Sequence, residues 1–202
     1  MIHALVLAAG ESRRMGMPKP LLRFNDTTFL EQIVGVLRNS GVDGITVVLG
    51  ARAQMVRESV DLSRVDVVVN ENYAQGQLSS LIRGLSSLSA DTDAILLCLA
   101  DHPFITRDVV GRLMGAFRQS RRPIVLPTFQ GRRGHPALFA SSLFDELANA
   151  PQDKGARHVV ASNEDKVLEI DVADRGVLVS IDTPDDYRLC LGAEPQVVSK
   201  KP

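Results

Sequence analysis

Short apolar segments rich in valine, isoleucine and leucine recur along the chain, separated by segments with helical spacing. The apolar segments are Ile2 to Ala8, Ile45 to Leu49, Val65 to Val69, Ala94 to Leu99 and Ile124 to Leu126. None of them alternates cleanly between apolar and polar residues, which is typical of strands covered by helices on both faces. The pattern predicts an α/β fold, a three-layer sandwich with a mostly parallel central sheet and right-handed crossovers.

Two of the intervening segments have apolar residues at the spacing of one helix face. These residues are Leu30, Ile33, Val34 and Leu37 in the first segment, and Val110, Leu113, Met114 and Phe117 in the second. Thr28 and Glu31 predict a capping box before the first helix, and Thr106 is expected to cap the second. A final helix is expected to begin at Thr183 and Pro184, because threonine is a favoured cap and proline a favoured first helical residue.

The pattern changes after residue 126. Residues 127–136 are rich in glycine, arginine and proline, and the later strands, Ala137 to Ala140 and Val167 to Val172, are short and irregular. We expect this half to add a small antiparallel extension at the edge of the sheet and one wall of a substrate site. Residues 1–193 are predicted to form a single domain, and residues 194–202 a polar, frayed tail.

Composition narrows the class of protein further. Of the 202 residues, 45% are apolar and 23% charged, which excludes a disordered or collagen-like chain. The net charge of −1 lacks the basic excess of proteins that bind nucleic acid, so no such partner is expected. No apolar run is long enough to cross a membrane and no signal peptide is visible, which predicts a cytoplasmic location. Cys98 and Cys190 have no CxxC spacing and are predicted to be reduced core thiols.

The most informative segment is the loop that leaves the first strand, LAAGESRRMGMPKPLL at residues 7–22. In α/β sheets ligands bind outside the carboxyl ends of the strands, and small residues there let backbone amides approach an anion. Arg13, Arg14 and Lys19 stand beside Gly10 and Gly16, a cluster suited to a polyphosphate. The spacing matches neither a Walker A nor a GxGxxG motif. The alternative is an ordinary turn whose basic residues face solvent.

Two aspartates are candidate metal ligands. Asp101 follows directly after an apolar strand, where its carboxylate could hold Mg²⁺ against a triphosphate. A turn-capping role is the alternative, although Thr106 already offers a cap. Asp182, in the IDTP segment, could share the same ion or could instead support Thr183 at the start of a helix.

Two further segments have the character of an acceptor site: QGQLSS at residues 75–80, which opens a helix, and RRGHP at residues 132–136. The first offers hydroxyls and amides at a helix N-terminus, and the second has a glycine that permits close approach. The candidate acceptor-binding residues are Gln77, Ser79, Ser80, Gly134, His135 and Pro136. The alternatives are a helix cap and a solvated loop. No histidine has the spacing of a zinc site, and His135 has no partner that would mark it as a general base.

The chain resembles the MobA-like nucleotidyltransferases, in the branch that contains the molybdenum cofactor cytidylyltransferases. The resemblance rests on six segments in order: LAAGESRRMGMPKPLL, GQLSS, LADHPF, GRRGHPALF, DKGAR and IDTPDDY. It implies a Rossmann-like nucleotidyltransferase fold. Two positions depart from the family pattern: Gln152 stands where glycine is usual before DKGAR, and Ser180 where a second acid is frequent before IDTP.

The resemblance also implies residue roles. The nucleotide would be bound by Leu7, Ala8, Ala9, Gly10, Ser12, Arg13, Arg14, Gly16 and Lys19. Arg14 and Lys19, which would bind its phosphates, and Asp101 are the candidate catalytic residues, and Asp101 and Asp182 would hold Mg²⁺. Ala9 matches the cytidylyl branch, since the guanylyl branch has glycine there, and favours CTP as donor.

The implied reaction moves CMP from CTP to a phosphorylated acceptor, molybdopterin or molybdenum cofactor, and releases pyrophosphate. A molybdoenzyme could then receive the product. Two alternatives stay open: a pyrophosphorylase that uses GTP or another nucleotide with a sugar or alcohol phosphate, and a non-catalytic carrier of a nucleotide or pterin.

Overall fold

A computed structural model describes residues 1–198 and contains one large mixed sheet of eight strands. The strand order is β10-β7-β9-β6-β1-β4-β5, and β8 pairs with β7 beside this row. The strands are β1 (Ile2–Ala8), β4 (Gly44–Leu49), β5 (Asp66–Val69), β6 (Ala94–Leu99), β7 (Ile124–Phe129), β8 (Arg132–Arg133), β9 (Ala137–Ala140) and β10 (Val167–Asp171). Two short strands, β2 (Arg23–Phe24) and β3 (Thr27–Thr28), form a separate antiparallel pair. The predicted strands are all present.

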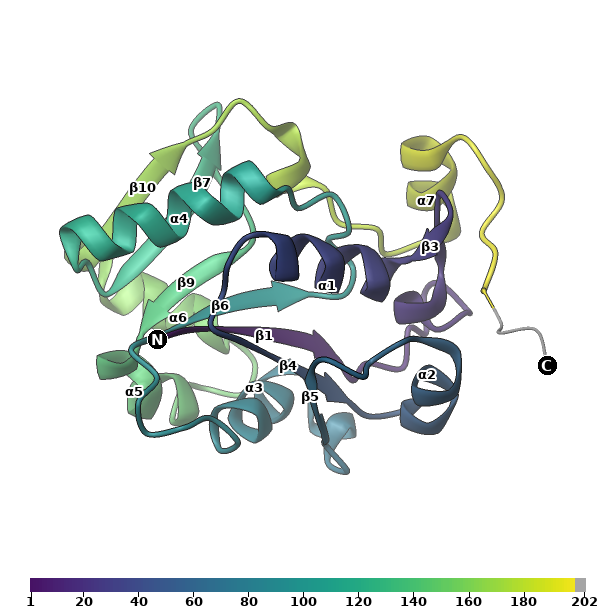
Figure 1. The fold of residues 1–202 in the computed structure, drawn as a ribbon, viewed down its shortest axis with the longest axis horizontal. Coiled ribbons are helices and arrows are strands. Elements are labelled where there is room, and N and C mark those ends of the chain that lie inside the picture. Colours follow the sequence, from purple (N-terminus) through teal and green to yellow (C-terminus); the bar gives the residue numbers. More distant parts are fainter. Residues whose placement is uncertain (199–202) are drawn as a thin grey trace.

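Helices cover both faces of the sheet, as Figure 1 shows. They are α1 (Phe29–Asn39), α2 (Ala53–Ser59), α3 (Gln77–Leu85), α4 (Arg107–Ser120), α5 (Phe144–Ala148), α6 (Ala156–Ser162) and α7 (Pro184–Leu191). Alternate residues of β1 serve opposite layers: Ala4 and Val6 belong to the core beneath α1 and α4, whereas Leu5 and Leu7 belong to the core beneath α3, α5 and α6. The predicted three-layer sandwich is therefore confirmed.

The helix starts follow the predicted capping with one exception. Thr28 and Glu31 form a capping box in which Glu31 N donates to Thr28 Oγ1 at 3.1 Å and Thr28 N donates to Glu31 Oε2 at 2.9 Å. Thr183 and Asp186 form a second one at α7. Thr106 occupies the N-cap position of α4, but its hydroxyl donates to Asp174 Oδ2 at 2.9 Å instead. The prediction that its side chain caps the helix is wrong because a carboxylate from a distant segment competes for the hydroxyl.

The antiparallel part of the sheet lies inside it and not at the edge. β9 runs antiparallel to both of its neighbours, β6 and β7, whereas the edge strand β10 is parallel to β7. Ala137, Leu138 and Phe139 are buried, and such a strand gains from neighbours on both sides. The predicted antiparallel extension exists, but its placement at the edge is wrong.

The C-terminal segment is paired as far as it is described. Arg23 N donates to Gln196 O at 2.8 Å and Val198 N donates to Leu21 O at 3.0 Å, with a bridge between Leu22 and Val197. The prediction of a frayed tail is wrong for residues 196–198, because they form backbone hydrogen bonds with the chain near Leu22. Residues 199–202 of that prediction lie outside the described residues.

The two thiols differ in burial. Cys98 is buried in β6, as predicted, whereas Cys190 is only half-buried beside the small core of Met15, Leu22 and Phe29. The prediction of a core thiol is thus wrong for Cys190. Among residues 1–198, no helix is long and apolar enough to span a membrane.

Candidate active site

A cavity of about 950 Å³ opens at the carboxyl ends of β1 and β6. This is the end of a parallel sheet at which ligands bind in α/β folds. Of the predicted site residues, those that line it are Leu7, Ala8, Ala9, Gly10, Ser12, Arg13, Arg14, Lys19, Gln77, Ser80, Asp101, Gly134, His135 and Asp182. Gly16, Ser79 and Pro136 are not among its lining residues. One cavity thus brings together segments from both halves of the chain.

The loop after β1 is held in a compact turn by its own backbone. Ser12 adopts a positive φ of 58°, and its carbonyl accepts from the amides of Met15 and Gly16. Its hydroxyl accepts from the amide of Lys19 at 3.0 Å. Met15 is 2% exposed and anchors the loop in the small core under α7. These contacts fix where the Lys19 side chain enters the cavity.

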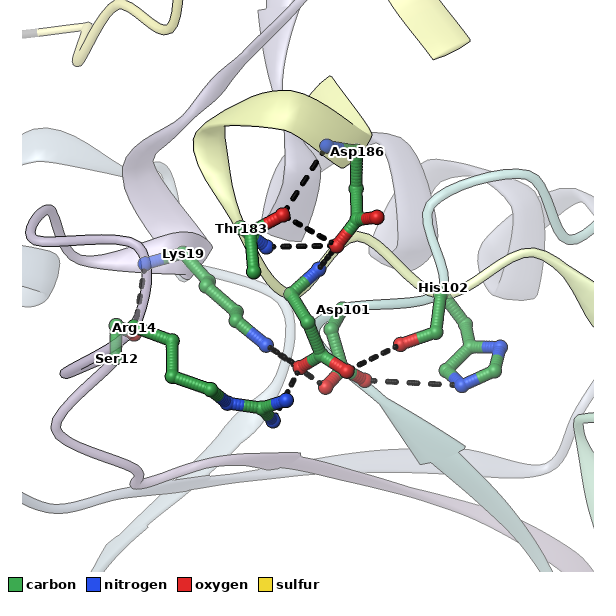
Figure 2. Close-up of polar contacts among 9 residues, drawn as sticks. Ser12, Arg14, Lys19, Asp101, His102, Thr183 and Asp186 are labelled. Carbon is green, nitrogen blue, oxygen red and sulfur yellow. Dashed lines mark hydrogen bonds and ion pairs between the residues drawn. The ribbon is translucent and has the colours of Figure 1, made fainter. Parts of the chain in front are cut away.

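Lys19 joins the two predicted carboxylates (Figure 2). Its Nζ lies 3.1 Å from Asp101 Oδ2 and 2.5 Å from Asp182 Oδ1, and Arg14 Nη2 lies 2.9 Å from the same Asp182 oxygen. Lys19 is 12% exposed, whereas Asp101 and Asp182 are 27% and 30% exposed. Three segments far apart in the sequence therefore meet at one ammonium group.

Asp182 is held from several directions. Its amide donates to Asp186 Oδ2 at 3.0 Å, within the capping box that starts α7, and the amide of Ile181 donates to Asp101 O at 2.9 Å. Ser180, at the position where the family often has an acid, donates its hydroxyl to Asp182 Oδ2 at 3.4 Å. Burial raises the pKa of Asp182, but the hydrogen bond from Lys19 and the charges of Lys19 and Arg14 outweigh burial and hold that pKa below its usual value. The carboxylate is therefore ionised at neutral pH.

The two carboxylates fit a divalent cation. Asp101 Oδ1 is buried and has no hydrogen-bond partner among residues 1–198, an arrangement that costs free energy unless another group binds the oxygen. Carboxylate oxygens are the ligands that Mg²⁺ and Mn²⁺ prefer. Within residues 1–198 no group of three or more acidic, histidine or cysteine side chains could hold a metal ion. A cation at Asp101 and Asp182 would thus need further ligands from a phosphate or water, as is common for Mg²⁺.

The profile of the MobA-like NTP transferase domain family matches residues 4–167. The chain belongs to this family. The match covers β1 to the start of β10 and so includes the loop after β1 and Asp101. The resemblance that the motifs indicate is confirmed.

Relatives of this MobA-like chain have different names. It is 31% identical to a protein named nicotine blue oxidoreductase from Paenarthrobacter nicotinovorans, over 93% of this chain and 96% of that protein. It is 27% identical to the molybdenum cofactor cytidylyltransferase of Escherichia coli, over 92% and 93%. A molybdenum cofactor guanylyltransferase from Mesorhizobium japonicum is 33% identical over 78% and 76%.

Solved structures agree with the fold. Rv0371c from Mycobacterium tuberculosis is 35% identical, with a TM-score of 0.86 over 95% of this chain and 97% of that one. The same protein in complex with manganese is 34% identical, with a TM-score of 0.82 over 95% and 98%.

Two histidines in the MobA-like cavity were not recognised together from the sequence. The rings of His102 and His135 lie 4.6 Å apart, and the Nδ1 atom of each is buried without a hydrogen-bond partner. His102 Nε2 lies 3.8 Å from Asp101 Oδ1. Burial lowers the pKa of both imidazoles, to about 4 for His135. A spacing of 33 residues gives no signal in the sequence. The two histidines meet because β9, which follows His135, pairs with β6, which precedes His102.

The serines of the GQLSS segment have a structural role. Asn70 Nδ2 donates to Ser79 Oγ at 2.8 Å and to Ser80 Oγ at 3.0 Å, and the Ser79 hydroxyl lies within hydrogen-bond distance of Asn72 O and Gly76 O. Ser79 therefore fastens the loop before α3 and does not line the cavity. The Ser79 hydroxyl thus acts at the start of a helix, as in the alternative interpretation of this segment. Ser80 and Gln77 line the cavity.

Gly134 is required by close packing. A Cβ at this position would lie 2.4 Å from the carbonyl oxygen of Val177. Gly134→Ala is expected to lower the free energy of unfolding by about 1–3 kcal/mol, because backbone atoms must move to admit the methyl group. Denaturant unfolding measures this change. The matched control is Gly115→Ala in α4, where a Cβ would meet no described atom within 4 Å outside the adjacent backbone of its own helix. This variant should be more stable by about 0.5–1 kcal/mol. Equal stability of the two variants would contradict the packing argument.

Proposed function

We propose that this chain is a metal-dependent nucleotidyltransferase that moves CMP from CTP to a phosphorylated acceptor of the molybdenum cofactor type. The observation that carries the proposal is the meeting of Asp101 and Asp182 at Lys19, beside the basic loop that follows β1. Family membership and the relatives named as cofactor cytidylyl- and guanylyltransferases support it. The proposed setting is the cytoplasm, with a molybdoenzyme as recipient of the product.

The reaction needs alignment and charge neutralisation more than proton transfer. An oxygen of the acceptor phosphate, already anionic at neutral pH, attacks the α-phosphorus of CTP. The bond between that phosphorus and the oxygen bridging to the β-phosphate breaks, and pyrophosphate leaves with the electron pair. Because nucleophile and leaving group are both anions, positioned cations lower the barrier by offsetting their charges.

The chain's own residues can supply most of these cations. Lys19 and Arg14 would bind the triphosphate, because both side chains already lie at the cavity wall and Lys19 leaves its backbone at a fixed point. Asp101 and Asp182 would hold Mg²⁺, which when bound supplies further positive charge at the phosphates. The manganese complex of a relative supports a divalent ion in this family. Ala8, Ala9 and Gly10 would contact the base and ribose.

The preference for CTP rests on Ala9, which lines the cavity and is 3% exposed. Nucleotide preference is tested by adding CTP, GTP, ATP and UTP separately, each with Mg²⁺ or Mn²⁺ and molybdopterin, and measuring pyrophosphate. We expect release with CTP well above release with the other three nucleotides. Greatest release with GTP would contradict the CTP preference but preserve the transferase.

The same assay tests the other classes of function. Release only with sugar or alcohol phosphates would indicate a pyrophosphorylase with a different acceptor. Tight nucleotide binding without release under every condition would indicate a carrier. The relative named an oxidoreductase gives a further contrast, because a redox reaction consumes an electron donor and leaves the triphosphate intact.

A further inference from the structure

Two arginines in the cavity have side chains without a partner among residues 1–198. Arg13 pairs with Glu11 at 2.6 Å, Arg14 and Lys19 pair with the aspartates, and Arg133 pairs with Glu164 and Glu169. Among the arginine and lysine side chains that line the cavity in the described part of the chain, this leaves only those of Arg132 and Arg157 without an ion pair or hydrogen bond. Their positive charges are available to a ligand.

Arg132 is carried by a rigid piece of backbone. β8 pairs with β7, with Arg132 opposite Phe129. Both Arg132 and Arg133 line the cavity, but the Arg133 side chain is committed to Glu164 and Glu169. The next residues are fixed as well, since Gly134 N donates to Pro127 O and His135 N donates to Val177 O, both at 2.8 Å.

Arg157 belongs to α6 but lines the same cavity as Arg132. It stands in the first turn of α6, and the loop before it is tied to the α3 side by Gln152 Nε2, which donates to Gln75 O. Burial is the main reason that the pKa of His135 falls to about 4, and the charges of His102 and Arg157 add to the effect. Arg157 is thus close enough to His135 to influence it.

The cavity around these arginines has an apolar floor. It consists of side chains from β6, β7, β9 and α6: Leu97, Leu126, Ala137, Phe139 and Val160. Of these elements, β9 and β7 lie on the side of β6 away from β1, whose following loop is basic. An apolar floor with two unpaired guanidinium groups favours a molecule that combines a ring system with an oxyanion.

We propose that Arg132 and Arg157 form an anion-binding subsite for the acceptor, separate from the Arg14 and Lys19 subsite for the nucleotide. The acceptor class is an aromatic or other apolar ring system that carries a phosphate, a further acidic group, or both. The assignment of this half of the cavity to an acceptor rests on the proposed transferase function, whereas the anion subsite itself does not.

The test measures binding and needs no turnover. Phenyl phosphate is the probe, titrated by calorimetry into the protein saturated with Mg²⁺ and α,β-methylene CTP, so that the nucleotide subsite is filled. If the arginines bind the phosphate, Arg132→Gln and Arg157→Gln should each weaken phenyl phosphate binding about tenfold, as expected for loss of a charge-assisted hydrogen bond. The Kd of CTP should change less than about twofold. Arg118→Gln, which removes an exposed arginine of α4 outside the cavity, is the matched control and should change neither.

A second probe identifies which acidic group is bound. 4-Carboxyphenyl phosphate adds a carboxylate to the same ring. If the arginines bind the phosphate, both probes weaken equally in the variants, and if they bind a further acidic group, only the second probe weakens. Both results support the subsite.

Three results would overturn it: no binding of either probe to the wild-type protein, unchanged binding of both probes in both variants, or a loss of CTP affinity as large as the loss for the probes. The last would place both arginines in the nucleotide subsite. Failure of the proposed function is distinguishable, because the wild-type protein would then release no pyrophosphate while the probes still depended on Arg132 and Arg157.

Discussion

Replacing Asp101 by asparagine is expected to lower kcat/KM for pyrophosphate release about 1,000-fold, because a neutral amide replaces a charged ligand of the proposed cation. The substitution keeps the size of the side chain, so the cavity keeps its shape. Asp101 Oδ1 is the buried oxygen without a partner, and Oδ2 is the one that contacts Lys19. The metal dependence should also change: half-maximal activity should need a higher Mg²⁺ concentration than in the wild type.

The control for this variant is Asp91→Asn, which removes an exposed carboxylate outside the cavity. Both variants should unfold at temperatures close to that of the wild type. Full activity of Asp101→Asn at saturating Mg²⁺ would remove Asp101 from the metal site. Loss of activity together with loss of folded structure would assign Asp101 a structural role instead.

Lys19→Met is expected to reduce both nucleotide affinity and kcat, by about 100-fold or more in kcat/KM. The ammonium would bind phosphate oxygens in the ground state and in the transition state, so its loss affects both quantities. Steady-state kinetics with varied CTP separates the two effects. Lys19→Arg should restore only part of the activity, because a planar guanidinium cannot take the place of a compact ammonium between two carboxylates. Wild-type kinetics in Lys19→Met would exclude Lys19 from the site.

The same variant should change the titration of Asp182. Lys19 is the main group that holds the pKa of Asp182 below its usual value, so the pKa should rise in Lys19→Met. In the wild type the stabilisation from this lowered pKa is present above the unfolded value of about 3.9 and is lost as pH falls through the folded value. The variant lacks this contribution at neutral pH. Carbon-detected NMR of the carboxyl groups reports the titration of Asp182 in the wild type and in the variant. An Asp182 pKa that is the same in both would contradict the contact between Lys19 and Asp182.

The order of elements and the positions of the two carboxylates could be predicted because both follow from local patterns. Continuous apolar runs indicate strands buried on both faces, and Thr28 with Glu31 marks a helix start without reference to the rest of the chain. Asp101 could be assigned to the sheet's ligand-binding end because it directly follows a strand. A cation shared by Asp101 and Asp182 could be proposed, but the contact of Asp182 with Lys19 depends on how α7 packs under the first loop.

The predictions that failed depend on competition between distant groups. The Thr106 hydroxyl binds Asp174, which lies 68 residues away, and residues 196–198 pair with the chain near Leu22. The hydrogen bond of Ser79 and the ring contact of His102 likewise depend on distant residues, Asn70 and His135 respectively. Nothing in the DKGAR pentapeptide indicates that the Arg157 side chain has no ion-pair partner among the described residues.

The reversed strand β9 lies between two regions of the sheet that build different walls of the cavity. Strands β1, β4, β5 and β6 are parallel and lead to the loop after β1, whereas the elements from β7 to α6 build the opposite wall of the cavity. We therefore expect substitutions in residues 127–160 to act mainly on the second wall. Directed evolution confined to that stretch is a route to altered acceptor choice on an unchanged nucleotide-handling scaffold.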